Sequence, residues 1–303
     1  MESEDQEDFG FERDGLLAAI ERSDFFLEEG WSKPTRALDL GGVRWSPDYV
    51  NGSAALAIVV GNKVPSFLER RLRAAKIAGA RLLCVVDWTA LSSREALLLL
   101  SEVGAEVALI DDALAISPPL PLLKFLGVEE FAVDPDVRKE LIRHGIEACL
   151  SASTSDLKGK TLEWLLHFMF SQVQDFRVRS CNYKTASEEL DVVVQLTTID
   201  GRRCWAHMSA PFLVVEAKNR SDKASQEVVS KLNTVISVKR GACKIGIIVS
   251  LSGFTSGAST QVLKLAASDR IFVLIDKKKL ERWGFSDDYD GVLDDIVSEA
   301  VLD

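Results

Sequence analysis

The sequence predicts an α/β protein with two domains, and three observations support this prediction. The chain has 303 residues, of which 47% are apolar, and this length favours two hydrophobic cores over one. Between residues 35 and 112, apolar runs rich in β-branched residues alternate with segments of helical periodicity. From residue 160 onward the order of elements changes to α-β-β-β-α-β-α-β.

Residues 1–30 are expected to form an acidic arm followed by a short helix. The first 14 residues carry a net charge of −6, and the segment GLLAAIERSDFFLEEG has a helical pattern. Such an arm is either a solvated tail or a strip that mimics the charge of DNA and inhibits its own protein. The sequence leaves both interpretations open.

Residues 31–150 are expected to form a small parallel α/β domain that recognises a target or senses a signal. Strands connected through helices need right-handed crossovers, which produce a parallel sheet. Proline-rich SPPLP (117–121) is typical of a connector, and Asp134 is expected to cap a helix that runs to about Gly145. The expected strands are ALAIVV (55–60), RLLCVVD (81–87) and AEVALID (105–111), separated by the helices SFLERRLRAAKIAG and SSREALLLLSEVG.

Residues 151–303 are expected to form the second domain. Its first element is a largely apolar helix, and its last is a short amphipathic helix in an acidic tail. That tail helix packs either on its own domain or on a second subunit. The expected order is helix 160–172, strands 175–183, 189–197 and 211–218, helix 225–241, strand 244–252, helix 256–268 and strand 271–276.

Composition excludes several classes of protein. The five cysteines are far apart and only three histidines are present, so neither a zinc cluster nor a disulfide framework is expected. No run of about 18 uncharged apolar residues occurs, and the acidic start MESEDQEDFGFERD is unlike a signal peptide. We therefore expect a soluble cytoplasmic protein without a membrane segment.

The distribution of charge favours a polyanionic partner for the second domain. The net charge is −10, yet residues 151–282 carry 20 Lys and Arg against 13 Asp and Glu. Scattered cations are sufficient for contacts with a phosphate backbone, although each one alone is usually a solvated surface residue. The candidates are Arg202, Arg203, Lys239, Arg240, Lys244, Lys277, Lys278 and Lys279.

The stretch FLVVEAKN, residues 212–219, indicates a site. Alternate side chains of a strand share a face, so Glu216 and Lys218 project together from its end. The preceding strand begins with Asp191, which can converge on Glu216 if the two strands are neighbours. Two carboxylates beside a lysine suit a hard divalent cation and phosphodiester hydrolysis. A lone Glu-x-Lys, however, is usually an exposed ion pair of little energetic value.

The helix 160–172 adds a further carboxylate. Glu163 lies in an apolar segment, and burial of an unpaired carboxylate is costly, so it needs either a cation or a position near solvent. His167 follows one turn later on the same face, and we expect it to be a core or rim histidine rather than a catalytic base.

Residues 156–282 resemble the PD-(D/E)XK nuclease superfamily, most closely its Mrr-type restriction endonucleases. The resemblance rests on EELDVVV, on VVEAKN 25 residues later, on the preceding helix with its glutamate, and on GIIVSLSGFTSGA at 246–258. It implies a restriction-endonuclease-like α/β/α domain with a mixed central sheet.

The resemblance also implies residue roles. Asp191 and Glu216 match the metal-binding acids, Lys218 the catalytic lysine and Glu163 the helix glutamate, while Gln226 matches a glutamine near the substrate. Glycines that commonly precede the first acid are replaced by TASEELD, so Glu188 and Glu189 are rival candidates for its role.

These features together predict a Mg²⁺-dependent DNA endonuclease, in which Mn²⁺ can substitute. The resemblance implies that it acts in restriction or phage defence. A homodimer is expected for cutting two strands, and an activating ligand or partner protein is expected at the amino-terminal domain. The alternatives are an RNA or single-strand nuclease, a nucleic-acid-binding module that does not cut, and a nucleotide-sensing module.

Overall fold

The computed structural model divides into two compact units, Met1–His144 and Gly145–Asp303. The division falls inside helix α6 (Pro135–Ser151), a few residues before the junction expected at residue 151. No helix among the described residues is both long enough and apolar enough to cross a membrane. The structure describes residues 13–61, 63–91, 93–110, 116–117, 119–121, 135–184, 189–197, 203–208, 210–239 and 241–302.

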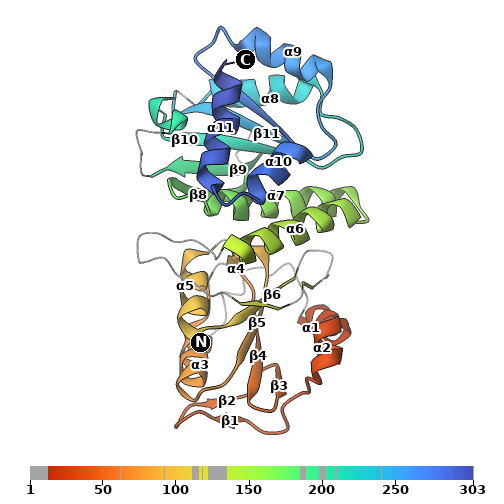
Figure 1. Ribbon diagram of the computed structural model, residues 1–303, viewed down its shortest axis with the longest axis vertical. Coiled ribbons are helices and arrows are strands. Elements are labelled where there is room, and N and C mark those ends of the chain that lie inside the picture. The colour runs from red at the N-terminus through yellow and green to blue at the C-terminus, as the bar shows by residue number, and fades with distance from the viewer. Residues whose placement is uncertain are drawn as a thin grey trace. The chain divides into compact units, whose positions relative to one another are not determined.

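The first unit contains a five-stranded sheet whose centre is parallel (Figure 1). Its two edge strands pair antiparallel with their neighbours, so the expectation of a parallel sheet is correct only for the three central strands. The strands, in spatial order, are β3 (Tyr49–Asn51), β4 (Ala54–Val59), β5 (Leu82–Val86), β6 (Glu106–Leu109) and β7 (Leu120–Pro121). A separate hairpin joins β1 (Leu38–Asp39) to β2 (Arg44–Trp45).

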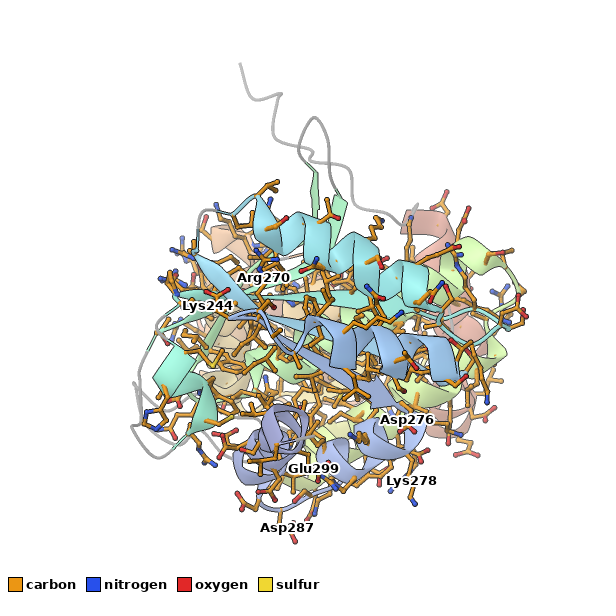
Figure 2. All side chains as sticks on the ribbon, turned by 90° about the horizontal axis from the view of Figure 1, so that it is seen from above. Lys244, Arg270, Asp276, Lys278, Asp287 and Glu299 are labelled. Atoms are coloured by element: carbon orange, nitrogen blue, oxygen red, sulfur yellow. The ribbon has the colours of Figure 1, made fainter. Side chains whose placement is uncertain are left out.

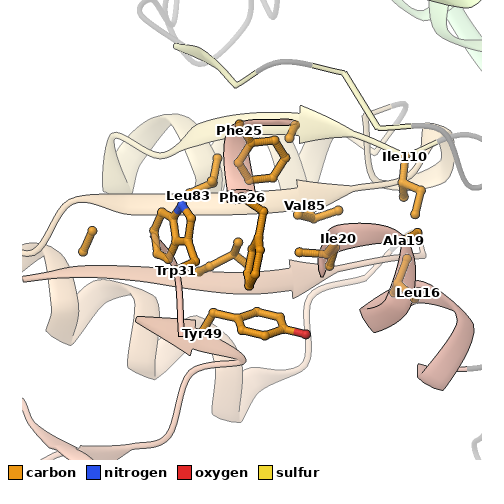
Figure 3. Packing of buried hydrophobic residues seen from close by; sticks show 13 residues of the cluster. Leu16, Ala19, Ile20, Phe25, Phe26, Trp31, Tyr49, Leu83, Val85 and Ile110 are labelled. Carbon is orange, nitrogen blue, oxygen red and sulfur yellow. The ribbon is translucent and has the colours of Figure 1, made fainter. Parts of the chain in front are cut away.

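Both faces of this sheet are covered by helices. α3 (Ser66–Ile77), α4 (Trp88–Leu91) and α5 (Arg94–Val103) follow the central strands. α1 (Arg13–Arg22) and α2 (Asp24–Glu29) contribute to the core on the face that β4, β5 and β6 present through alternate residues (Figure 3). The short helix expected near residues 15–30 is therefore a helix pair in the core, while the acidic arm before residue 13 lies outside the described residues.

The proline-rich connector is in part an edge strand. Leu120 and Pro121 form β7 and pair with Val107 and Glu106. Proline has no N–H to donate, and an edge strand is the place in a sheet that tolerates this loss. The expected cap Asp134 lies outside the described residues, and α6 runs to Ser151 rather than ending near Gly145.

The second unit has a mixed five-stranded sheet with the order β12-β11-β10-β9-β8. β8, β9 and β10 are antiparallel neighbours, whereas β10, β11 and β12 run parallel. The expected order α-β-β-β-α-β-α-β is confirmed in the secondary structure. The strands are β8 (Phe176–Lys184), β9 (Glu189–Leu196), β10 (Phe212–Lys218), β11 (Cys243–Ser250) and β12 (Ile271–Asp276).

Helices lie on both sides of this sheet (Figure 1). α8 (Gln226–Ser237) and α9 (Ser256–Leu265) share one apolar core with Val214 and Ile248. α7 (Ser155–Ser171), α10 (Lys277–Gly284) and α11 (Tyr289–Leu302) meet through aromatic rings, and Phe170 lies 5.0 Å from Trp283 between ring centroids. The tail helix α11 packs on its own unit with Leu293, Ile296 and Val297 buried.

Two short helices of this unit were not predicted. η1 (Cys204–Met208) lies in the connection from β9 to β10 and buries Trp205, whose ring packs on that of Phe176. α10 occupies the three-lysine segment that the sequence suggested to be a connection, and the side chain of Asp276 caps it by accepting a hydrogen bond from Lys279 N at 2.8 Å.

A glycine lets α8 pack closely on the sheet. A Cβ on Gly246 would lie 2.8 Å from Ile236 Cδ1 and 2.9 Å from Leu232 Cδ2, closer than real Cβ contacts. The absence of a side chain on this residue of β11 therefore sets how near α8 comes to the strands that end at the candidate site.

Candidate active site

The strand register places Asp191 and Glu216 opposite each other. Val192 pairs with Val215 in the antiparallel ladder of β9 and β10, so Asp191 and Glu216 are the next residues across from one another. Both carboxylates are buried, with 9% and 4% of their residues exposed. The convergence expected from the sequence is therefore present on one face of the sheet.

Asp191 is held in a setting that disfavours its negative charge. Its Oδ2 accepts a hydrogen bond from Ala217 N at 2.6 Å, in place of a backbone carbonyl at the end of the ladder. Burial first, and the Glu216 carboxylate second, raise the pKa of Asp191 to about 7. Glu163 raises this pKa further, while the Ala217 N–H and Lys218 lower it. Near neutral pH, a bound cation would favour loss of this proton.

Glu216 lies close to the ammonium groups of two lysines. Its Oε1 lies 2.6 Å from Lys218 Nζ and 3.8 Å from Lys231 Nζ. The side chain of Lys218 is 20% exposed, whereas that of Lys231 on α8 is 63% exposed. The Glu-x-Lys pair is thus buried on its anionic side, which distinguishes it from an ordinary surface ion pair.

Helix α7 supplies Glu163. Its charge lies near enough to Asp191 to affect the pKa of that group, and its Oε1 lies 3.9 Å from the position of a Cβ on Gly159. His167 stacks edge-on against Trp164 at 5.8 Å, and burial lowers its pKa to about 4. The imidazole is therefore neutral at physiological pH, as a core histidine would be.

Two groups of predicted residues are not joined to this cluster. Gln226 starts α8, and its Oε1 points toward Gly257 at the start of α9; no contact among the described residues links it to Asp191, Glu216 or Lys218. Of the rival acids, Glu188 and the side chain of Glu189 lie outside what the structure describes.

Asn219 has a structural contact that the sequence did not reveal. Its Nδ2 donates to Cys149 O at 2.8 Å in α6 and to Lys158 O at 2.9 Å in α7. Asn219, the residue after Lys218, therefore links the end of β10 to two helices by hydrogen bonds. The only sequence signal was a polar residue directly after a strand-end lysine.

Only some of the cations expected to contact phosphate lie at the end of the sheet that carries Asp191, Glu216 and Lys218. Lys218, Ser250 and Asp276 are in register, so they mark one end. Figure 2 shows Lys244 and Arg270 at the other end, and Lys244 pairs with Asp269 there at 3.4 Å. Lys277 and Lys279 follow Asp276 but pair with Glu281 and Glu299. Arg202 and Arg240 lie outside the described residues.

More suitable cations follow β10 directly. Arg220 and Lys223 are exposed in the loop between Lys218 and α8, and the exposed Lys231 lies on α8 itself. Lys231 was missed because an exposed helix lysine has no distinguishing pattern in the sequence.

The donor set fits a hard divalent cation. In the described part of the chain, no group of three or more His, Cys, Asp or Glu side chains is arranged to hold a metal ion. Mg²⁺ is commonly bound through one or two carboxylates and keeps several waters. Within the described contacts, Oδ1 of Asp191 and Oε2 of Glu216 make no hydrogen bond or ion pair. These oxygens suit Mg²⁺ or Mn²⁺, and they do not suit a zinc centre built from Cys and His.

Comparison with protein families gives a match, which lies in the second unit. Residues 155–284 match the family model Mrr_cat, described as restriction endonuclease. The resemblance expected for residues 156–282 is thereby confirmed.

Comparison with individual proteins adds little to this. A search of curated proteins gives no match. Among solved structures, protein VC1899 from Vibrio cholerae is 12% identical, with 78% of this chain and 80% of that chain covered and a TM-score of 0.31.

Proposed function

We propose that this protein, whose residues 155–284 form a restriction-endonuclease domain of the Mrr type, is a metal-dependent endonuclease that hydrolyses DNA phosphodiester bonds. The observation that carries the proposal is the placement of Asp191 opposite Glu216, with the Lys218 ammonium 2.6 Å from Glu216. The family description, restriction endonuclease, supports a role in restriction, and we extend this proposal to phage defence. The amino-terminal unit would then recognise a target or a signal.

Asp191 and Glu216 would hold Mg²⁺ or Mn²⁺ through their remaining oxygens. When bound, the ion lowers the pKa of a coordinated water and neutralises charge on the phosphoryl group. Asp191 must be ionised to take part, and its raised pKa means that loading the site releases a proton below about pH 7.

Lys218 would act at the reacting atoms. Its ammonium can orient the attacking water or stabilise the charge that develops on the phosphate oxygens. The water oxygen forms a bond to phosphorus, one phosphorus–ester oxygen bond breaks, and the leaving oxygen takes up a proton. Glu163 would act as a positioning residue, because its charge faces Asp191 and strengthens the site's preference for a cation.

The direct test is cleavage of plasmid DNA by the full chain with Mg²⁺ or Mn²⁺, with and without EDTA. We expect nicked and linear products that EDTA prevents. Parallel reactions on duplex DNA, single-stranded DNA and RNA test the substrate class, since a metal site of this kind acts on phosphate rather than on base identity. Faster cutting of RNA than of duplex DNA would overturn the DNA assignment.

Metal binding gives a readout that does not need activity. Titration calorimetry with Mn²⁺ should show one site in the wild type and none in Asp191→Ala. Equal Mn²⁺ binding by the two proteins would contradict the proposal, even if an activating ligand or partner is missing from the cleavage reaction.

A further inference from the structure

One carboxylate oxygen of the site faces two ammonium groups. Glu216 Oε1 lies 2.6 Å from Lys218 Nζ and 3.8 Å from Lys231 Nζ. The closer lysine is four-fifths shielded from water, while the side chain of Lys231 is 63% exposed. The two cations therefore differ in freedom: one is fixed within the site and the other is at its rim.

The fold brings Lys231 there through α8. Val229, Leu232, Val235 and Ile236 bury the apolar face of this helix on the sheet, and its close approach depends on Gly246. Lys231 lies beside that face, so its long side chain can reach Glu216 while its ammonium group stays in contact with solvent. Rotation about the side-chain bonds is enough to move Nζ by several ångströms without any change in the backbone.

A divalent cation held by Glu216 would compete with both ammonium groups. Like charges at this range repel, and a mobile exposed group is the one that moves. A displaced Lys231 can turn to the phosphate backbone of a substrate in the site, in competition with the exposed Glu227 one turn earlier on α8. A surface ion pair of ordinary type would have no such alternative partner and would add little to the protein.

We propose that Lys231 is a phosphate-contacting residue of the nuclease site, which exchanges Glu216 for a DNA backbone phosphate when the divalent cation is bound. This inference rests on the function proposed above and adds to it a substrate-holding residue outside the Asp191, Glu216 and Lys218 set. Lys231 strengthens binding of the substrate rather than the chemical step, so its loss raises KM more than it lowers kcat.

The test compares Lys231→Ala and Lys231→Arg with Lys264→Ala, an exposed lysine of the neighbouring helix α9. Binding of a fluorescent DNA duplex is measured by anisotropy with Ca²⁺, a hard cation that takes the same oxygen ligands, after confirming that the DNA stays intact. We expect Lys231→Ala to weaken binding roughly 3- to 10-fold and to reduce the slope of log Kd against log salt by about one. Lys231→Arg should keep most of the affinity, and Lys264→Ala should match the wild type.

A second readout uses Mn²⁺ without DNA. Removal of a competing ammonium group should leave Mn²⁺ affinity unchanged or tighten it, whereas a ligand-supporting or structural role for Lys231 would weaken it. If Lys231→Ala binds the duplex with the affinity and salt slope of the wild type, and the wild-type protein cuts DNA, this inference is overturned and the proposed function stands. Failure of the wild type to bind DNA or Mn²⁺ would overturn both.

Discussion

Two aspartates, one in each unit, have a pKa raised above the ordinary range chiefly by burial, and they differ in what surrounds them. Asp87, directly after β5, accepts hydrogen bonds from Gly61 N at 3.1 Å and from Ala90 N at 2.8 Å. Asp191 accepts one, from Ala217 N, and faces the acids Glu216 and Glu163.

This difference separates a structural carboxylate from a candidate ligand. The N–H donors around Asp87 compensate its charge, so it anchors the loop after β4 and the start of α4. The like charges around Asp191 raise the free-energy cost of its own negative charge. Among the described residues, Lys218 is the cation that lowers this cost. A raised pKa alone therefore does not mark a functional site, and the sign of the neighbouring charges decides.

The largest expected effect is on DNA cleavage. Asp191→Ala and Lys218→Ala should each lower the cleavage rate by at least about 10²- to 10³-fold, since Lys218 would stabilise charge at the reacting phosphate and Asp191 would hold the ion that does so. Asp87→Asn should cut within about twofold of the wild type at a temperature where it is folded. Initial rates on plasmid DNA at saturating Mg²⁺ measure this. Equal losses in Asp87→Asn and Asp191→Ala would remove the distinction between the two aspartates.

The next effect is stabilisation by metal. A ligand at 100 times its Kd stabilises the folded state by about 2.7 kcal/mol, which corresponds to several degrees in the melting temperature. Mn²⁺ should therefore raise the melting temperature of the wild type and of Asp87→Asn relative to EDTA, but not that of Asp191→Asn. Calorimetric melting at pH 8 provides the measurement, and an undiminished shift in Asp191→Asn would place the metal elsewhere.

The smallest effect concerns stability without metal. The pKa of Asp191, about 7 when folded against an ordinary 3.8, means that the folded protein binds more protons than the unfolded chain between these values. Stability in EDTA should therefore fall as the pH rises from about 4 to about 7, and Asp191→Asn should remove this loss. At pH 8 we expect Asp191→Asn to be more stable than the wild type by roughly 2 kcal/mol, below the full linkage for such a shift.

The matched variant should gain less stability, because the pKa of Asp87 is also raised by burial but its N–H donors offset part of that shift. In Asp87→Asn, Oδ1 can keep both N–H donors, but the amide NH₂ would replace Oδ2, which accepts from Gly61 N at 3.2 Å, at a cost of about 1 kcal/mol. Denaturant titrations of both variants in EDTA at pH 8 decide this. An equal or larger gain in Asp87→Asn than in Asp191→Asn would show that the neighbours of the two carboxyl groups do not matter in the way described.

The core of the site was predictable because it depends on local rules. Alternation along β10 places Glu216 and Lys218 on one face, and a hairpin-like neighbour with Asp191 at its start needs only the correct register. Lys231 was not predictable in this way. Lys231 and Lys264 are both exposed helix lysines, and only the tertiary approach of α8 to the sheet separates them.

The same contrast holds for the fold. The long apolar strands and helices were predictable from periodicity. The three-residue strand β3 and the two-residue strand β7, by contrast, exist because a neighbouring strand pairs with them. Helix α10 was missed because three successive lysines suggested an exposed connection. Its evidence was in the sequence as the cap residue Asp276 and the three-residue spacing of Leu280 and Trp283, both of which are buried.

Gly246 sets how closely α8 can pack on the sheet without contributing any polar group to the site. A methyl group at this position would meet the side-chain ends of Ile236 and Leu232, which would have to shift. If α8 moved with them, the distance between Lys231 and Glu216 would change. The position of a charged group at the site would thus depend on a residue with no side chain, located in a strand interior.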